Sequence, residues 1–225
     1  MTQREVLAAA ISYALQGAAL VTSACLDQPT PCAEWDLRTL LVHLAASMAA
    51  IEEALGSGHL KALAPDERPG PDGELVPGGG LRPGDWCGDP VELLRDRAAG
   101  LLVTTFLSDT GSIEIAGIAV PAEVVRGTGA LETAVHGWDI YTACGQHRPV
   151  PNGIARPLLA MLSQLIPARD GLFAGPVAAP PSASPGDRLV AALGRQCSQT
   201  PPGSVPRLPA SSITSEPPQV SGSGE

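Results

Sequence analysis

The chain has 225 residues, a length that suits one domain with a modest appendage and is sufficient for a hydrophobic core. Apolar residues make up 44% of it but aromatic residues only 3%, so close helix packing is favoured over a β-sandwich. The formal charge of −9, without any basic run, argues against nucleic acid as a partner, because phosphate-backbone binding needs clustered Lys and Arg. Five cysteines without CxxC pairs indicate a reducing compartment, and we expect a cytoplasmic protein.

Residues 4–24 are predicted to form the first helix, because apolar residues recur along them at helical spacing. Residues 6–25 could also be taken for an export signal, since they are apolar and end in small residues before a cysteine. Tyr13 and Gln16 interrupt that run, however, and Thr22 is a poor match to a lipoprotein cleavage site. We therefore interpret the segment as a helix of a soluble domain, and we expect no membrane partner because no run is long and apolar enough to span a bilayer.

A turn-rich break at residues 27–32 precedes the second predicted helix, which begins near the N-cap Asp36 and runs to about Leu55. Gly56 is expected to end it. Residues 56–90 are dense in Gly and Pro and are predicted to form a long loop, of the kind that is often functional or mobile.

The second half of the chain contains two long predicted helices and two short ones. The long helices cover roughly residues 90–108 and Pro121 to Ala143, with Gly145 closing the latter. Residues 112–120 alternate briefly and predict a short extended piece. The short helices are expected at 153–166 and 187–195, the last ending at Gly194. Residues 198–225 are rich in Pro, Ser and Gly and predict a disordered tail after a domain of residues 1–197.

The predicted helix from Pro121 to Ala143 carries Glu132 and His136 four residues apart, so both project from one helical face. From spacing alone, a surface Glu–His pair is the commoner arrangement. The neighbouring Ala134 and Val135 make the helix largely apolar, however, and a carboxylate facing a core is costly unless it is paired or metal-bound. The pair is therefore a candidate for half of a metal site.

His43 lies in LLVHLAA, an apolar stretch of the second predicted helix. A lone buried histidine is more often a satisfied core residue than a ligand, but helical bundles build metal sites from facing helices. Together with Glu132 and His136 it would give three N/O ligands and leave one coordination position open, as in catalytic sites. Zinc suits two imidazoles and a carboxylate, and ligand type leaves iron, nickel and manganese open. The sequence alone does not show that the three side chains meet.

Three segments together resemble the mycothiol-dependent maleylpyruvate isomerase family, within the DinB-like superfamily: TPCAEWDLRTLLVHL (30–44), ETAVHGWDIYTACGQ (132–146) and RLVAALGR (188–195). The resemblance covers roughly residues 4–197. It implies an all-α, DinB-like four-helix bundle with a divalent metal, usually zinc. The implied ligands are His43, Glu132 and His136. It also implies mycothiol, the low-molecular-weight thiol of actinobacteria, as the thiol cosubstrate.

The chemistry that this resemblance implies is the activation of a thiol. A free thiol has a pKa near 8.5 and attacks well only as the thiolate, and a bound cation can deprotonate it. The thiolate would add to an electrophilic small molecule. A transferase would release the adduct, whereas an isomerase would allow bond rotation and then eliminate the thiol. Full-length isomerases of the family carry an extra C-terminal domain, and the predicted tail in its place favours a transferase or a pathway-specific relative over maleylpyruvate isomerisation.

Two other classes of function stay open at this stage. One is a metal- or ligand-binding protein without turnover, and the other is a metal-independent enzyme or scaffold that reuses the bundle. A monomer and a homodimer are both compatible with the sequence.

Two tryptophans and the aspartates beside them are further candidates. We predict that Trp35 and Trp138 contact the cofactor, with Trp35 at the pocket mouth, although a hydrophobic staple beside the N-cap Asp36 is the commoner role for Trp35. Asp139 lies three residues after His136, close enough on a helix to hydrogen-bond a ligand imidazole. A purely fold-stabilising role for it is equally compatible with the sequence.

Arg195 and Cys32 are the remaining candidate site residues. Arg195 is predicted to be catalytic, binding an anionic group of the substrate, with the capping of a helix end as the alternative. Cys32 is a candidate nucleophile or fourth ligand, but its place in the loop before the second helix favours a structural role.

Overall fold

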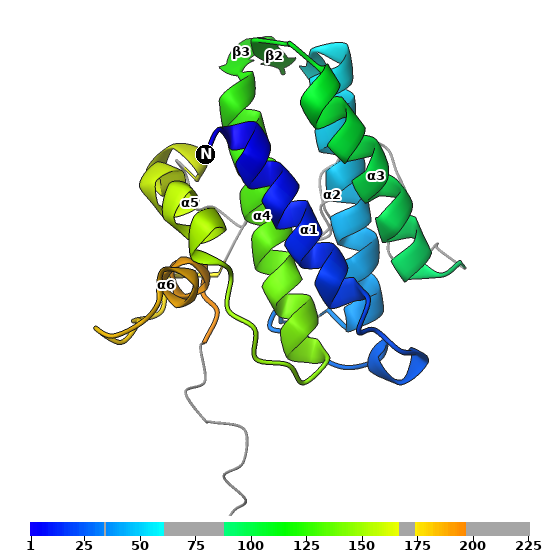
Figure 1. Ribbon diagram of the computed structural model, residues 1–225, viewed down its shortest axis with the longest axis vertical. Helices are drawn as coiled ribbons and strands as arrows, with labels where there is room; N and C mark the ends of the chain where they lie inside the picture. Colours follow the sequence, from blue (N-terminus) through cyan, green and yellow to red (C-terminus); the bar gives the residue numbers. More distant parts are fainter. Residues whose placement is uncertain (34, 61–87, 167–173, 197–225) are drawn as a thin grey trace, which may run out of the picture.

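The computed structural model describes residues 1–33, 35–60, 88–166 and 174–196. These residues form a mostly helical fold, which confirms the predicted all-α class. Four long helices build a bundle and two shorter helices lie beside it (Figure 1). The helices are α1 (Gln3–Ala18), α2 (Leu37–Ser57), α3 (Pro90–Leu107), α4 (Ala122–Ala143), α5 (Asn152–Leu165) and α6 (Pro185–Ala192).

Three of the four bundle helices begin at side-chain caps. Thr2 and Glu5 form a capping box at the start of α1, each accepting a hydrogen bond from the other's backbone N–H. The predicted N-cap Asp36 accepts a hydrogen bond from the backbone N–H of Thr39 at 2.8 Å, and Asp89 starts α3 in a similar way. These caps satisfy backbone donors that the first turn of a helix leaves without partners.

The bundle is closed by contacts of α1 with α4 and α3, and of α2 with α3 and α4. Gly137 allows α1 to approach α4 closely, since a Cβ there would lie 3.0 Å from Tyr13 Cδ1 and 3.2 Å from Ala14 Cα. One continuous core runs between the helices. Because α2 and α4 are neighbours, residues far apart in the sequence face each other across that core.

A small three-stranded sheet joins α2, α3 and α4 at one end of the bundle (Figure 1). Its strands are β1 (His59–Leu60), β2 (Ser112–Ile115) and β3 (Ile118–Pro121). The extended piece predicted at residues 112–120 is therefore a hairpin. Its turn residues Ala116 and Gly117 both have positive φ, 52° and 80°, which is the pattern of a type I′ turn. β1 adds to this hairpin in parallel with β2, a pairing that the sequence did not predict.

The first helix is shorter than predicted. It ends at Ala18, and a 3₁₀ turn, η1 (Ser23–Cys25), follows. The prediction to residue 24 was wrong because the apolar residues beyond Ala18 do not continue a buried stripe. Leu20 is 45% exposed, and Thr22 has extended backbone angles.

Two other boundaries differ from the prediction because of glycine and capping chemistry. Gly56 lies inside α2, and the helix ends at Gly58, which takes the left-handed conformation with φ 76°. The last helix begins at Pro185 because Ser184 and Asp187 form a capping box, and it ends before Gly194, whose φ is 82°.

α2 is the one candidate membrane span found in the described part of the chain. It is long enough, and its mean hydropathy of 1.3 is high enough, to meet that test by composition, which differs from the expectation that no run of the sequence would do so. Half of the tested window is buried inside the bundle, as expected for a core helix that packs on α3 and α4. Most of the predicted loop at 56–90 and the tail predicted at 198–225 lie outside the described residues.

Candidate metal centre

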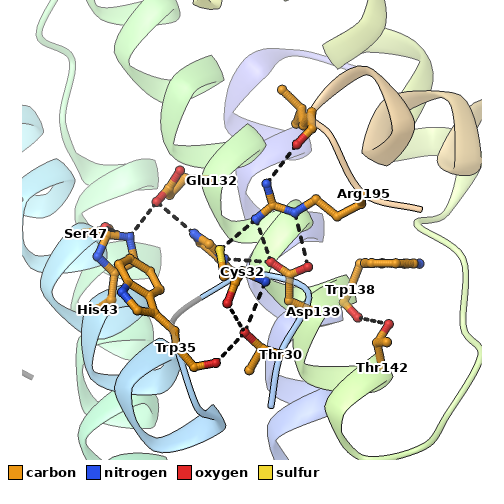
Figure 2. A network of polar contacts seen from close by, with 12 residues as sticks. Thr30, Cys32, Trp35, His43, Ser47, Glu132, Trp138, Asp139, Thr142 and Arg195 are labelled. Atoms are coloured by element: carbon orange, nitrogen blue, oxygen red, sulfur yellow. Dashed lines mark hydrogen bonds and ion pairs between the residues drawn. The ribbon is translucent and has the colours of Figure 1, made fainter. Parts of the chain in front are cut away.

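Three side chains from two helices converge at one point of the bundle, and Figure 2 labels two of them, His43 and Glu132. His43 comes from α2, and Glu132 and His136 come from α4. Glu132 Oε1 lies 2.9 Å from His43 Nε2 and 3.2 Å from His136 Nε2. The candidate ligand atoms of all three lie within 4.8 Å of one another. The predicted ligand set is therefore brought together by the packing of α2 on α4, and a carboxylate with two imidazoles is a donor set that suits Zn²⁺.

The second ring nitrogen of His136 is held by a buried carboxylate. His136 Nδ1 lies 3.0 Å from Asp139 Oδ2, and the Asp139 side chain is 0% exposed. This contact orients the ring so that Nε2 faces Glu132. Carboxylate partners of this kind fix the tautomer and orientation of metal-binding histidines. Asp139 thus has the position relative to His136 that its i+3 spacing predicts.

Arg195 is the next residue in the series of polar contacts that runs from Glu132 through His136 to Asp139. Its Nη2 donates to Asp139 Oδ2 at 2.8 Å and its Nε donates to Asp139 Oδ1 at 3.3 Å, so the pair is bidentate. Its Nη1 donates to the carbonyl of Leu193, the C-cap residue of α6. Arg195 therefore caps a helix end, which was the alternative to substrate binding. Binding of an anionic substrate would have to compete with Asp139.

Cys32 lies closer to the centre than a purely structural role requires. Arg195 Nη2 lies 3.1 Å from Cys32 Sγ, and this sulfur is within 4.8 Å of donor atoms of His136 and Asp139. Thr30 shapes the loop, because its Oγ1 donates to the carbonyl of Trp35 at 2.9 Å and accepts from the backbone N–H of Cys32. The sequence signal for this position was its place just before the helix of His43.

The two predicted aromatic contacts differ in position. The Trp35 ring lies over His43, with 4.4 Å between the ring centroids, and it lines the cavity described below. Trp138 is only 4% exposed, belongs to the core, and points away from the cluster in Figure 2. It is not among the described residues that line the cavity. The reason is helical geometry, because a residue two positions after His136 lies about 200° around the helix.

Burial and charge oppose each other in the cluster. Burial by itself would raise the pKa of Glu132, but His136 and His43 outweigh it and hold this pKa well below its usual range. Burial would lower the pKa of His136, but Glu132, Asp139 and Cys32 raise it well above 6.5. The pKa of Asp139 is lowered despite its burial, because His136 and Arg195 stabilise the carboxylate. The cluster therefore stabilises positive charge between two carboxylates.

A cavity of about 550 Å³ adjoins the cluster. His43, Glu132 and His136 line one part of it, together with Cys32, Trp35 and Arg195. Its volume is within the range of pockets for small molecules. The three candidate ligands thus lie at the wall of a space that could hold a substrate.

Comparisons with known proteins show the family of this chain. The family model described as the mycothiol maleylpyruvate isomerase N-terminal domain matches residues 7–141, which include all three candidate ligands. Two uncharacterized proteins of Mycobacterium tuberculosis, from two strains, are 27% identical over 187 residues, which is 79% of this chain and 91% of theirs.

Two crystal structures, of mycothiol-dependent maleylpyruvate isomerase and of a mutant of it, are also similar to this chain. Each has a TM-score of 0.51 at 20% identity, and the match covers 72% of this chain and 70% of theirs. This likeness concerns the fold, and it confirms that the predicted helical bundle resembles the fold of that isomerase.

Proposed function

We propose that this chain, which belongs to the mycothiol maleylpyruvate isomerase N-terminal domain family, is an enzyme that activates the thiol of mycothiol for addition to an electrophilic small molecule. The observation that supports this most directly is the convergence of His43, Glu132 and His136 beside a cavity of about 550 Å³. A divalent ion held there, which we propose to be zinc, would supply the positive charge that turns a thiol into the reactive thiolate.

The proposed roles of the individual residues follow from their contacts. His43 Nε2, Glu132 Oε1 and His136 Nε2 would hold the ion, because these atoms already face one point. Asp139 accepts the hydrogen bond of His136 Nδ1 and so keeps Nε2 directed at that point. Arg195 neutralises Asp139 in its buried position. In this proposal Arg195 is a positioning residue, and it does not bind the substrate.

Trp35 and the cavity supply the rest of the site. The Trp35 ring covers His43 and forms part of the cavity wall, where it would contact the cosubstrate and keep water from the ligands. Addition of the thiolate is common to a transferase and an isomerase. The two differ in whether the adduct is released or eliminates the thiol after bond rotation.

We propose the cytoplasm as the location, since the thiol must be kept reduced.

The proposal is tested by metal analysis together with a product assay. Purified protein should contain about one divalent ion per chain, and mass spectrometry should detect mycothiol adducts, or isomerised acceptors, with a panel of electrophiles. His43→Ala should lose the ion and reduce turnover by more than about 100-fold, since removing even an outer partner of a ligand typically costs 10–100-fold. The matched control is His147→Ala, because His147 is exposed and lies outside the cavity lining.

The outcomes separate the three classes of function. An ion without turnover on any electrophile would favour a binding protein. Turnover that is unchanged in His43→Ala would contradict the proposal and favour a metal-independent enzyme.

A further inference from the structure

The cavity beside the candidate metal centre has two unlike sides. The polar side is the cluster of His43, Glu132 and His136 with the residues around it. The other side is apolar and comes from several helices. Among the described residues it includes Met48 and Ile51 of α2, Leu101 of α3, Leu131 of α4, and Leu165 and Ile166 at the end of α5.

Polarity falls in the same direction along the two helices that carry the candidate ligands. On α2 the cavity-lining residues at four-residue intervals are His43, Ser47 and Ile51. On α4 the lining runs from His136 through Glu132 to Gly129 and Thr128, and the Thr128 hydroxyl donates to the carbonyl of Val124. Ile51 and Gly129 face each other, because a Cβ at Gly129 would lie 3.2 Å from Ile51 Cγ2. A molecule in the cavity would therefore have one end at the polar cluster and the other between apolar side chains.

The charges of the cavity wall do not favour a second anion beside a thiolate. Arg195 is the one arginine or lysine among the described residues that line the cavity. Its guanidinium already makes a bidentate pair with Asp139 and a hydrogen bond to the carbonyl of Leu193. A divalent ion at the centre would contribute a charge of +2, which Glu132 and a bound thiolate together cancel. A dicarboxylate would thus lose its hydration and find no uncommitted cation among these residues, which is costly.

We infer that the acceptor bound by this cavity is an uncharged electrophile with an apolar substituent, of the class of conjugated esters and ketones, and not a dicarboxylate. This inference rests on the proposed function. In the addition, the thiolate sulfur forms a bond to the β-carbon of the acceptor. The π electron pair moves to the α-carbon, which takes a proton from solvent. The thiol loses one proton and the α-carbon gains one, so the addition consumes no oxidant or reductant.

A binding experiment tests the acceptor class without requiring turnover. The probes are succinate and its dimethyl, diethyl and dipropyl esters, which are saturated and unreactive. They are titrated by calorimetry into the metal-loaded protein saturated with mycothiol, so that the thiolate and not a carboxylate of succinate occupies the open coordination position. The dissociation constant of the esters should fall with alkyl length, by up to about fourfold for each methylene that becomes fully buried. The dipropyl ester should bind at least about 100-fold more tightly than succinate, as expected where a buried charge lacks a partner. Succinate binding more tightly than the esters, or no dependence on alkyl length, would overturn the inference.

Variants of Ile51 locate the effect in the apolar wall. Ile51→Lys places a cation among the apolar residues and should weaken binding of the dipropyl ester by about 10-fold or more, while binding of succinate improves. Ile51→Met is the matched control, which keeps an apolar side chain of similar volume and should leave the preference unchanged. An Ile51→Lys protein that keeps the wild-type preference would show that this wall does not select the acceptor.

A parallel assay with reactive acceptors distinguishes this inference from the proposed function. Dimethyl maleate and the maleate dianion are each mixed with mycothiol, and the rate with enzyme is divided by the rate without it. A larger acceleration for the diester supports the inference, and a larger acceleration for the dianion contradicts it. If neither is accelerated but the esters still bind in the expected order, the proposed function fails for this acceptor class while the assignment of the cavity stands.

Discussion

Asp139 connects the candidate metal ligand His136 with the buried Arg195. Its carboxylate contacts both His136 Nδ1 and the guanidinium of Arg195, and none of its side chain is exposed. A single buried carboxylate therefore orients one candidate ligand and pairs with one buried cation. Removing a partner from a buried ion pair costs more than the pair contributes, because the remaining charge is left without compensation.

We expect Asp139→Asn to weaken both the fold and the metal site. The free energy of unfolding of the metal-free protein should fall by about 3 kcal/mol, because the charge of Arg195 loses its carboxylate. Metal affinity should fall about 10–100-fold, because His136 loses the acceptor that orients it. Urea unfolding and a competition titration with a chromogenic chelator measure the two effects.

The matched control is Asp109→Asn. Asp109 also pairs with an arginine, Arg4, at 3.3 Å, but its side chain is 97% exposed. Exposed pairs contribute about 0–1 kcal/mol, so this variant should change neither quantity by more than that. A similar loss in both variants would mean that the burial of Asp139 has no special effect.

α4 is the element that organises the site. It carries Glu132, His136 and Asp139 and packs against α1, α2 and α5. Its glycines permit this packing, since Gly129 faces Ile51 of α2 and Gly137 faces Tyr13 of α1. The candidate ligands on α4 meet His43 because such close helix contacts bring α2 within reach.

The end of α2 gives a prediction at the level of a single element. Gly56→Ala should stabilise the protein by up to about 1 kcal/mol, because Gly56 lies inside the helix and, among the described residues, a Cβ there meets only Thr104 Cγ2, at 3.7 Å. Gly58→Ala should destabilise it by about 1 kcal/mol, because Gly58 has φ 76°, a conformation that alanine rarely adopts. Equilibrium urea unfolding measures both changes, and the reverse order would place the helix end at Gly56 after all.

At the scale of the whole molecule, we expect metal binding, folding and pH to be linked through the same cluster. The pKa values of Glu132 and Asp139 are lowered from their ordinary 4.5 and 3.8, so their stabilisation is present above those values and is lost as the pH falls below them. The pKa of His136 is raised from 6.5, so its stabilisation is present below pH 6.5 and is lost as the pH rises through the raised value. The cluster therefore stabilises the metal-free protein most between about pH 4.5 and 6.5.

Metal binding should have the opposite dependence on pH. A ligating imidazole must be neutral, so an ion displaces the proton of His136 and binds more tightly as the pH rises. The rise in melting temperature on adding Zn²⁺ should therefore be larger at pH 8 than at pH 6, and should reach several degrees when zinc is about 1,000-fold above its Kd. Differential scanning calorimetry measures the shift, with His43→Ala as the control that should show little. A zinc-induced shift that does not change between these pH values would contradict the linkage.

Much of the fold could be predicted because its signals are local. Helical spacing of apolar residues, the N-cap Asp36 and the glycine after the helix of Glu132 and His136 are all read from neighbouring residues. The four-residue spacing of Glu132 and His136, and the three-residue spacing of His136 and Asp139, specify shared helix faces. The ends of α1 and α2 were less predictable, because exposure beyond Ala18 ends the first helix and the left-handed conformation of Gly58 ends the second.

The sequence by itself therefore determined the helical class, the pairing of Glu132 with His136 on one face, and the contact of His136 with Asp139, since each depends only on the geometry of one helix. Tertiary structure alone decided that His43 meets them, that Arg195 pairs with Asp139, and that Cys32 lies beside both. It also decided that Trp35 lines the cavity whereas Trp138 lies in the core. These contacts join segments far apart in the chain, and their geometry is set by how α2, α4 and the end of α6 pack together.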